Sequence, residues 1–373
     1  MKISKHIITF ILIILLFSCQ TKKISEKLII SATLNGFDDN TSVKLIDANS
    51  NKTIDSTILE NNHFILSKKI ENEPKTLFLV IGKQTIELFV GNENIKINGT
   101  KSDFPDKLKI TGSENQKMKM LLDNKLLSLN NRRMELLKKM FQLRNENKWN
   151  DKLQKQYWGE NGLISNVDKQ IDSITKNFIL NNVNTDFSLT QLIINKSIYS
   201  KSEVREVLSK LNEKYKNSKY NEVLSLYVNS AILKEGSKFA DFKGENKNGE
   251  IISFSSLLNN DFILLDFSSP HCSWCKKAFP SIKKISELEN VSVVTTWVNC
   301  SEKDWKEYYK LNNINWETLW DKKGKFSNAY TKYNIFGTPT YFLINRDGII
   351  VKIWKGYNEN LEKEIETIIK NAV

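Results

Sequence analysis

Apolar and polar positions alternate in short runs between residues 27 and 112, the two-residue period of strands with one buried face. Pairs of Asn and Gly interrupt the runs, as at Asn35-Gly36, Gly91-Asn92 and Asn98-Gly99, and supply turns. The predicted strands are residues 27–34, 42–46, 64–66, 76–81, 85–90 and 94–97. The pattern therefore predicts a small antiparallel β domain over residues 27–112, built as a sandwich.

After Ser113 the hydrophobic period changes to three and four residues, and no proline occurs between Asp106 and Ala240. The apolar stripe consists of Met118, Leu121, Leu122, Leu126, Leu129, Met134, Leu137 and Met140. We predict a helical region over residues 113–234, with later helices near residues 151–177, 189–198, 202–215 and 220–233. The stripe indicates a packing seam rather than a ligand site, and the region is either a spacer or a contact surface for a partner.

Strand and helix signals alternate in residues 235–373, which is typical of an α/β domain. Strands are predicted at residues 262–267, 291–298 and 340–344, and helices near residues 275–288, 302–311, 325–333 and 361–369. Hairpin turns are expected at Asn248-Gly249 and Asp347-Gly348. The predicted fold class is a multidomain chain with an N-terminal antiparallel β domain, a helical middle region and a C-terminal α/β domain.

Residues 1–18 have the composition of an export signal. Two lysines precede the apolar stretch 7–17, which is too short for an ordinary spanning helix, and Ser18 precedes Cys19. This layout resembles the signal of bacterial lipoproteins, in which the cysteine after the cleavage point is lipidated. We expect removal of the signal, a lipid anchor on Cys19 and a polar tether over residues 19–26. The alternative is a signal anchor with an incidental cysteine.

Composition excludes several classes of protein. The chain has 373 residues and a formal net charge of +12, but its charges are scattered rather than gathered in one arm, so no nucleic-acid partner is expected. Attraction to an anionic membrane surface remains compatible with this charge. The four cysteines are too few for a scaffold held by disulfides. Cys19 is assigned to the anchor, Cys272 and Cys275 form a pair, and Cys300 is left over.

Cys272 and Cys275 lie two residues apart, directly after the apolar run 262–267. The first sulfur is therefore expected at a helix N-terminus, where backbone N–H groups and the helix dipole favour a thiolate. Tetrahedral zinc needs two further ligands, and no second pair of cysteines or histidines follows. Covalent haem needs a histidine where this chain has Lys276. We expect no metal and no cofactor at the pair.

Two thiols at this spacing can exchange with a disulfide. A thiolate attacks one sulfur of the substrate and a second thiol resolves the mixed disulfide, so the two cysteines must differ in exposure and pKa. We assign Cys272 as the exposed nucleophile. Cys275, one turn into the helix, is the buried resolving thiol, and the two form a redox-active disulfide.

Residues 235–373 resemble the thioredoxin-fold domain of the TlpA/ResA-like thiol-disulfide oxidoreductases. The matching segments follow the family's order over about one third of the chain and are Asp266-Phe267, Cys272-Ser273-Trp274-Cys275, Phe279-Pro280, Gly337-Thr338-Pro339-Thr340 and Ile344-Asn345-Arg346-Asp347-Gly348. Residues 27–112 resemble, more weakly, the uncharacterised β domain that precedes thioredoxin-like domains in some bacterial lipoproteins.

The resemblance implies roles for three further residues. Asp266 stands where thioredoxin has a buried carboxylate, whose raised pKa lets it take the proton of Cys275; the alternative is an exposed or turn-capping aspartate at a strand end. The Thr338–Pro339 peptide is expected to be cis and to face the cysteines, the alternative being an ordinary trans turn. Thr338 would then pair with an extended substrate, and Pro339 would shield the sulfurs from metals.

Other residues near the pair allow more than one interpretation. Trp274 either contacts the substrate or packs over the helix end. The family usually has Trp and often Glu where this chain has His271 and Ala278, which leaves the donor and the substrate open. His271 stabilises the Cys272 thiolate when protonated, acts as a base when neutral, or is a solvated loop residue. Cys300 is either an alternative disulfide partner or a half-buried free thiol.

These features predict a thiol-disulfide oxidoreductase that is anchored to the inner or outer membrane of the cell envelope and faces the periplasm. Its substrates are thiols or disulfides of exported proteins. The resemblance favours reduction with electrons from a membrane thiol donor, in cytochrome c maturation or envelope repair. Two alternatives stay open: a thiol peroxidase, which the strand–CxxC–helix arrangement disfavours, and a partner-binding lipoprotein whose redox domain is regulatory or vestigial.

Overall fold

The computed structural model describes residues 25–71, 74–298 and 300–372. Within these ranges, the chain separates into two compact units, residues 25–45 with 54–113 and residues 46–53 with 114–372. The predicted signal and the lipid anchor at Cys19 lie outside the described residues. Within the ranges that are described, no helix combines the length and the apolar character that crossing a membrane requires.

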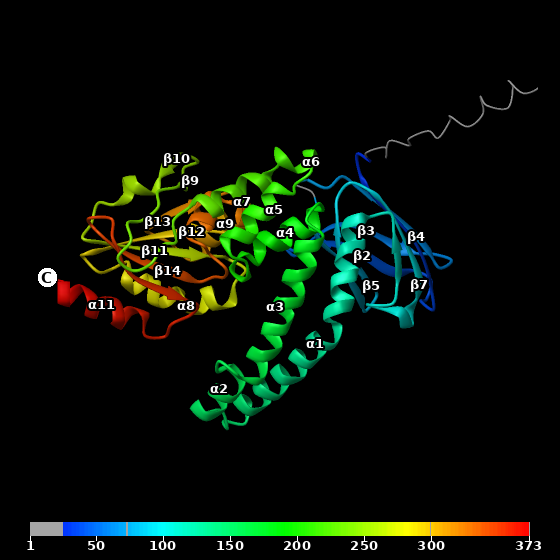
Figure 1. Cartoon of the computed structure of the whole chain (residues 1–373), viewed down its shortest axis with the longest axis horizontal. Coiled ribbons are helices and arrows are strands. Elements are labelled where there is room, and N and C mark those ends of the chain that lie inside the picture. The colour runs from blue at the N-terminus through cyan, green and yellow to red at the C-terminus, as the bar shows by residue number, and fades with distance from the viewer. Residues whose placement is uncertain (1–24, 72–73, 299, 373) are drawn as a thin grey trace, which may run out of the picture. The chain divides into compact units, whose positions relative to one another are not determined.

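The N-terminal part of the chain consists of two four-stranded sheets, with strand orders β4-β1-β7-β8 and β3-β2-β5-β6 (Figure 1). In β1 every second side chain is buried, and in β4 Phe64 and Leu66 are buried between exposed neighbours, which is the predicted alternation. The strands are β1 (Leu28–Asn35), β2 (Thr41–Asp47), β3 (Lys52–Leu59), β4 (His63–Lys68), β5 (Lys75–Ile81), β6 (Gln84–Val90), β7 (Asn94–Thr100) and β8 (Lys109–Thr111), with the short 3₁₀ turn η1 (Lys101–Asp103) between the last two.

Buried side chains of both sheets form one core, to which β1 contributes Ile30, β2 contributes Leu45 and β5 contributes Leu79. The predicted sandwich is therefore confirmed. The pair of β1 and β7 departs from the antiparallel expectation, because these two strands run parallel. The sequence pattern also failed to predict β3 and β8, whose side chains are mostly exposed or half-buried and carry little apolar alternation.

The middle region is helical, as predicted. It comprises α1 (Glu114–Asn145), α2 (Asp151–Trp158), α3 (Leu163–Asn181), α4 (Asp186–Ile194), the 3₁₀ turn η2 (Lys196–Ile198), α5 (Lys201–Ser209), α6 (Glu213–Lys216) and α7 (Lys219–Asn229). The single helix expected at residues 151–177 is two helices. At the break, a Cβ on Gly159 or Gly162 would lie 2.4 or 2.5 Å from a carbonyl oxygen of the preceding helix, so only glycine fits.

The apolar stripe of α1 is a narrower seam than the sequence predicted. Met118, Leu122 and Met140 are buried, as a packing seam requires. Leu121 and Met134, in contrast, are about half exposed. The α1 seam packs mainly against α3 and α4, so its role in the described residues is to hold the helical region together.

The C-terminal part is a seven-stranded sheet with the order β10-β9-β13-β12-β11-β14-β15. The interior strand β11 is buried along its whole length; β12 runs parallel to it on one side and β14 antiparallel on the other. The elements are β9 (Lys243–Glu245), β10 (Ile251–Ser253), η3 (Phe254–Leu257), β11 (Phe262–Ser268), α8 (Ser273–Ile285), β12 (Val291–Trp297), α9 (Glu302–Leu311), β13 (Glu317–Trp320), η4 (Gly324–Phe326), α10 (Asn328–Lys332), β14 (Thr340–Asn345), β15 (Ile350–Lys355) and α11 (Leu361–Ala372).

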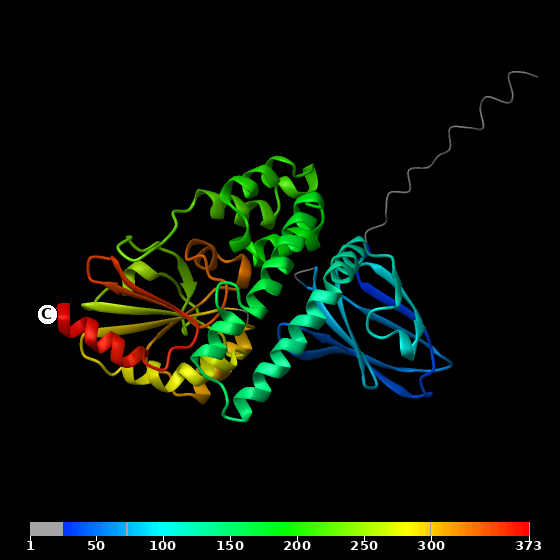
Figure 2. The same cartoon turned by 60° about the horizontal axis from the view of Figure 1, so that its bottom comes forward.

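Alternate residues of β11 enter two different cores. Ile263 and Leu265 pack into the core on one face of the sheet, whereas Leu264 packs into the other with side chains of α8 and α11. Figure 2 shows α8 and α11 side by side along that second face. The chain leaves the carboxyl end of β11 and enters α8 after four residues, which fixes the start of α8 at one edge of the sheet.

Candidate active site

Cys272 is the N-cap residue of α8, the position predicted from the sequence. The backbone N–H of Cys275 donates a hydrogen bond to the Cys272 sulfur over 3.3 Å. Cys272 is half-buried, whereas the Cys275 side chain is buried in the first turn of the helix. Both thiols are free. The structure thus brings the two sulfurs together with the difference in exposure that thiol exchange requires.

The two thiols have opposite pKa shifts. Burial raises the pKa of Cys272, but hydrogen bonds from the Cys275 thiol and from the N–H groups of Cys275 and Trp274 outweigh it, so the pKa lies below its ordinary value. Burial, and next the hydrogen bond with Cys272, raise the pKa of Cys275 well above its ordinary value. Near neutral pH, Cys272 is therefore the better source of a thiolate, and Cys275 remains a thiol.

The loop from Phe336 to Pro339 faces the pair. The Thr338–Pro339 peptide is cis, which confirms the prediction from the sequence. The Cys272 thiol donates a hydrogen bond to the Thr338 carbonyl oxygen over 3.3 Å, and Pro339 is buried. The Gly356 N–H donates to the Pro339 carbonyl over 2.8 Å and fixes that end of the loop to the residue after β15.

Asp266 lies on β11, six residues before Cys272, and is 4% exposed. Thr295 of the neighbouring strand donates a hydrogen bond to Asp266 Oδ2 over 3.1 Å, and within the described residues Oδ1 has no partner. Burial raises the pKa of Asp266 to about 7, against the lowering effect of Thr295. The alternative of an exposed or turn-capping aspartate is therefore wrong.

Asp266 and Cys275 line one small cavity of about 10 Å³, together with Tyr308 and Tyr341. A cavity of this size is close to the smallest that holds one water molecule. The carboxyl and the buried thiol therefore face one narrow space whose lining is mainly apolar and aromatic. A proton can pass between the two groups there without reaching bulk solvent.

His271 lies beside the pair but points toward Asp304. Its Nε2 is 3.4 Å from Asp304 Oδ2, and its side chain is about two-fifths exposed. Asp304 is held in place by the capping box that it forms with Ser301 at the start of α9. Among the described residues, no hydrogen bond joins His271 to the Cys272 sulfur, so the catalytic role of His271 stays a prediction.

Trp274, between the two cysteines, is 53% exposed. Its ring stacks on Tyr357 with a centroid separation of 5.6 Å. The Lys277 ammonium lies 5.3 Å from the Trp274 ring and 4.6 Å from the Tyr357 ring. These three side chains form an exposed aromatic and basic surface, here called the Trp274 platform, beside the nucleophile.

Cys300 follows β12 at the same edge of the sheet, but it packs into a cluster of aromatic side chains that includes Trp305 and Trp320. Burial, and next the charge of Asp304, raise the pKa of Cys300 to about 12. Such a thiol supplies almost no thiolate near neutral pH. The interpretation as a half-buried free cysteine is therefore favoured over an alternative disulfide.

In the described part of the chain, no group of three or more His, Cys, Asp or Glu side chains is placed to hold a metal ion.

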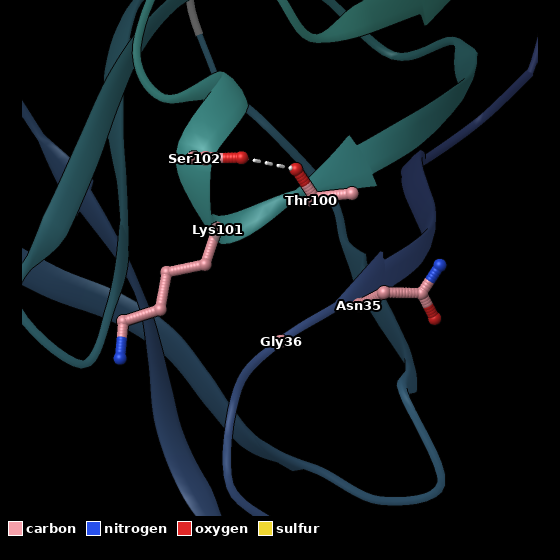
Figure 3. Close-up of a pocket in the computed structure, with 5 residues that line it drawn as sticks. All are labelled: Asn35, Gly36, Thr100, Lys101 and Ser102. Carbon is pink, nitrogen blue, oxygen red and sulfur yellow. Dashed lines mark hydrogen bonds between the residues drawn. The ribbon is translucent and has the colours of Figure 1, made fainter.

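A larger hollow, of about 460 Å³, opens between Asn35-Gly36 and the segment Thr100–Ser102 of the β domain (Figure 3). In Figure 3 the side chains of Asn35 and Lys101 point in different directions, and the hydroxyls of Thr100 and Ser102 hydrogen-bond to each other over 2.8 Å. Binding sites need polar groups that converge on a ligand. The five residues that line this hollow do not converge, so we assign it no function.

Several residues near the pair were not identified from the sequence. Tyr341 is the partner of Asp266 in the β11–β14 register, and Tyr357 lies over eighty residues after Trp274 in the chain. Only Asp304 had a local signal, because Ser301 stands three residues before it in the pattern of a capping box. The other contacts depend on how the strands and loops pair.

Comparison with known proteins supports the assignment of the C-terminal part to thiol-disulfide exchange. Residues 28–118 match the model of the family described as "Domain of unknown function (DUF4369)", and residues 236–353 match that of the AhpC/TSA family. The chain is 28% identical over 155 residues to the thiol-disulfide oxidoreductase ResA of Bacillus subtilis, a match that covers 40% of this chain and 83% of ResA.

Solved structures with a similar fold include the thioredoxin domain of a thiol-disulfide oxidoreductase from Bacteroides vulgatus. It is 23% identical, and the match covers 37% of this chain and 99% of that one with a TM-score of 0.34. StoA from Bacillus subtilis is 27% identical, with 33% and 95% covered and a TM-score of 0.28. The C-terminal part of this chain is thus a thioredoxin-like oxidoreductase domain that is similar to ResA, and it follows a β domain that matches the DUF4369 model.

Proposed function

We propose that this oxidoreductase reduces disulfides in exported proteins through the dithiol of Cys272 and Cys275. The observation that carries the proposal is the contact geometry of the Cys272 sulfur, which lies 3.3 Å from both the Cys275 nitrogen and the Thr338 oxygen. The first contact favours a thiolate, and the second places the sulfur beside a backbone segment that an extended substrate can reach. Reduction of insulin disulfides by the full chain tests the proposal.

The proposed reaction transfers two electrons to the substrate. The Cys272 thiolate attacks one sulfur of the substrate disulfide, that bond breaks, and the departing sulfur takes a proton from water. Asp266, as a carboxylate, then accepts the proton of Cys275 through the cavity that the two groups share. The Cys275 thiolate attacks Cys272, the mixed disulfide breaks, and the second substrate thiol leaves with that proton. The enzyme is left with a Cys272–Cys275 disulfide.

A second thiol pair must then reduce the enzyme disulfide. We propose a membrane thiol donor, which would exchange with the exposed Cys272 sulfur in the reverse sequence of steps. The similarity to a thiol-disulfide oxidoreductase supports dithiol exchange with such a partner. Cytochrome c maturation and envelope repair are the processes in which we propose that this reduction takes place.

Substrate binding is proposed to involve Thr338, Pro339 and Trp274. Trp274→Ala is expected to raise the KM for a peptide disulfide roughly tenfold, the effect of losing about 1.4 kcal/mol of aromatic contact, with kcat little changed. Phe141→Ala is the matched control, because Phe141 is equally exposed at 54% on α1. Steady-state kinetics with a peptide disulfide give both constants. Equal KM values for Trp274→Ala and the parent chain would refute the role of Trp274.

We further propose that the chain is exported and held at a membrane by lipid on Cys19, facing the periplasm. The support is the order of charged, apolar and small residues before Cys19. Cys19→Ser is expected to move most of the protein from the membrane fraction to the soluble fraction of expressing cells, because the anchor is lost. Fractionation followed by immunoblotting measures this. An unchanged membrane fraction would leave a signal anchor as the explanation.

Two other functions predict different results. A thiol peroxidase needs an arginine near the reactive sulfur, yet Arg346 pairs with Asp261 before β11, about 20 Å along the strand from the end that Cys272 follows. A peroxidase would consume hydrogen peroxide rapidly with Cys272 as its only required thiol. A partner-binding lipoprotein with a vestigial redox domain would show no exchange with any disulfide.

A further inference from the structure

The helical region and the redox domain belong to one compact unit and share an interface. Helices α4 and α7 contact η4 and α10, the segment that precedes the loop at Thr338 and Pro339. Tyr220 of α7 packs edge to face on Phe326 of η4, with a centroid separation of 5.6 Å. The helical region therefore lies against the part of the redox domain that leads into the active-site loop.

Lys196 is the most unusual residue of this interface. It begins the 3₁₀ turn η2, between α4 and α5, and is only 1% exposed. Its ammonium donates a hydrogen bond to the Ile335 carbonyl oxygen over 3.1 Å, and its own carbonyl accepts one from the Tyr227 hydroxyl over 3.3 Å. A fully buried lysine is rare in folded proteins unless its charge has partners.

Two aromatic rings complete the surroundings of the Lys196 ammonium. It lies 4.9 Å from the Tyr330 ring and 5.1 Å from the Phe336 ring, within the range of cation–π attraction. Burial, and next the charge of Lys325, lower the pKa of Lys196 to about 8. Near neutral pH the group thus remains largely protonated and attracts both rings and the Ile335 carbonyl.

The groups that Lys196 contacts are the start of the active-site loop. Ile335 and Phe336 are followed directly by Gly337, Thr338 and Pro339. Ile335 is buried in the core of the redox domain, but Phe336 is 40% exposed and a Cβ on Gly337 would have no neighbour within 4 Å, so packing does little to hold the two residues after Ile335. The Gly356 N–H holds the other end of the loop, at the Pro339 carbonyl. Lys196 therefore adds a hydrogen bond and a ring contact at the point where the loop leaves the core.

We infer that Lys196 is a positioning residue: the helical region uses it to hold the loop at Ile335 and Phe336, and thereby sets the Thr338 backbone for an extended substrate beside Cys272. The inference rests on the proposed function and extends it, because it gives the helical region a part in substrate binding. It predicts that a substrate with an extended backbone depends on Lys196, and that a small disulfide does not.

The direct test replaces Lys196 by methionine in the full chain, which keeps the length of the side chain and removes the donor and the charge. For a peptide disulfide, we expect the KM to rise roughly tenfold with kcat little changed, the scale of one lost hydrogen bond. The rate with hydroxyethyl disulfide, which has no peptide backbone, is expected to change less than about twofold. Equal losses for the two substrates, or no loss for either, would overturn the inference.

Lys219→Met is the matched control. Lys219 is an exposed lysine of the same interface, and its ammonium lies 5.0 Å from the Phe326 ring, away from the loop. This variant is expected to keep the KM of the parent chain for the peptide. If Lys219→Met raised the KM as much as Lys196→Met does, a general loosening of the interface would be the cause, and the specific role of Lys196 would be wrong.

A second measurement keeps the inference testable if Lys196→Met does not fold, or if the chain reduces no disulfide. Phe336→Leu removes the exposed ring that faces Lys196 from the loop. Without substrate, we expect the backbone amides of residues 335–338 to exchange hydrogen several-fold faster in this variant, because the loop loses its ring contact with Lys196. Unchanged exchange in this segment would contradict the inference whatever the protein's activity.

Discussion

Replacing Cys272 by serine is expected to lower the rate of disulfide reduction by the full chain by at least about 10³-fold. A hydroxyl at this position ionises far less readily than a thiol, even with the hydrogen bond from the Cys275 N–H, and its oxygen cannot exchange with a disulfide. The measurement is the initial rate of insulin reduction with dithiothreitol as the electron source, compared with the uncatalysed rate.

Two other cysteine variants separate the steps. Cys300→Ser is expected to keep the parent rate, because Cys300 is packed among aromatic side chains and burial raises its pKa to about 12. Cys275→Ser is expected to form one mixed disulfide per chain and then stop, since the resolving thiol is gone. Retention of most of the activity in Cys272→Ser would contradict the assignment of the nucleophile.

Asp266→Asn is expected to stabilise the folded chain by roughly 4 kcal/mol at pH 8, the free energy that corresponds to a pKa of about 7 in the folded state against 3.8. The folded state binds the proton of Asp266 more tightly than the unfolded state does. In the parent chain, the free energy of unfolding that depends on Asp266 is therefore highest below pH 3.8. It falls as the pH rises from 3.8 to about 7, and it does not change further above that pH. Asparagine keeps an acceptor for Thr295 and carries no charge.

Urea unfolding of both proteins at several pH values, followed by tryptophan fluorescence, measures this effect. The difference in unfolding free energy between Asp266→Asn and the parent chain should be small near pH 4 and grow up to about pH 7. The same variant is expected to resolve mixed disulfides more slowly at pH 7, because it cannot accept the proton of Cys275. A pH-independent difference in stability would show that Asp266 is not a buried titrating group.

The strand, the two cysteines and the helix that follows could be predicted because each depends on neighbouring residues. The apolar run of β11 is followed within a few residues by Cys272, which can cap a helix. A segment of about fifteen residues is therefore enough to predict the strand and the helix start. The same is true of the turns at Asn248-Gly249 and Asp347-Gly348, where glycine adopts a positive φ. These features therefore depend mainly on residues that are close together in the sequence.

Features that depend on pairing between distant segments were missed. The parallel alignment of β1 with β7 joins residues more than sixty positions apart, and nothing in either strand marks its neighbour. Strand β13 has only four residues, too few for a period to be recognised. The break at Gly159 and Gly162 differs from these, because two glycines close together in a helical pattern are themselves a local signal for a helix end.

The residues of the candidate site also differ in whether neighbouring sequence or distant contacts identify them. Cys272, Cys275, Asp266 and the Thr338–Pro339 peptide could be located because they stand in recognisable segments. Lys196 could not, because its sequence neighbours are ordinary for a polar turn, and its burial depends on Ile335, which lies 139 positions later. A buried charge becomes visible only once the two regions pack together.

The most direct test of the account is to equilibrate the full chain with glutathione buffers of graded redox potential and to determine by mass spectrometry which cysteines are joined. We predict a single two-electron transition between free thiols and a Cys272–Cys275 disulfide, with Cys300 reduced throughout and a midpoint near about −270 mV, as in reducing thioredoxins. A midpoint near about −120 mV would contradict the reducing direction. Absence of a Cys272–Cys275 disulfide at every potential would contradict dithiol exchange itself.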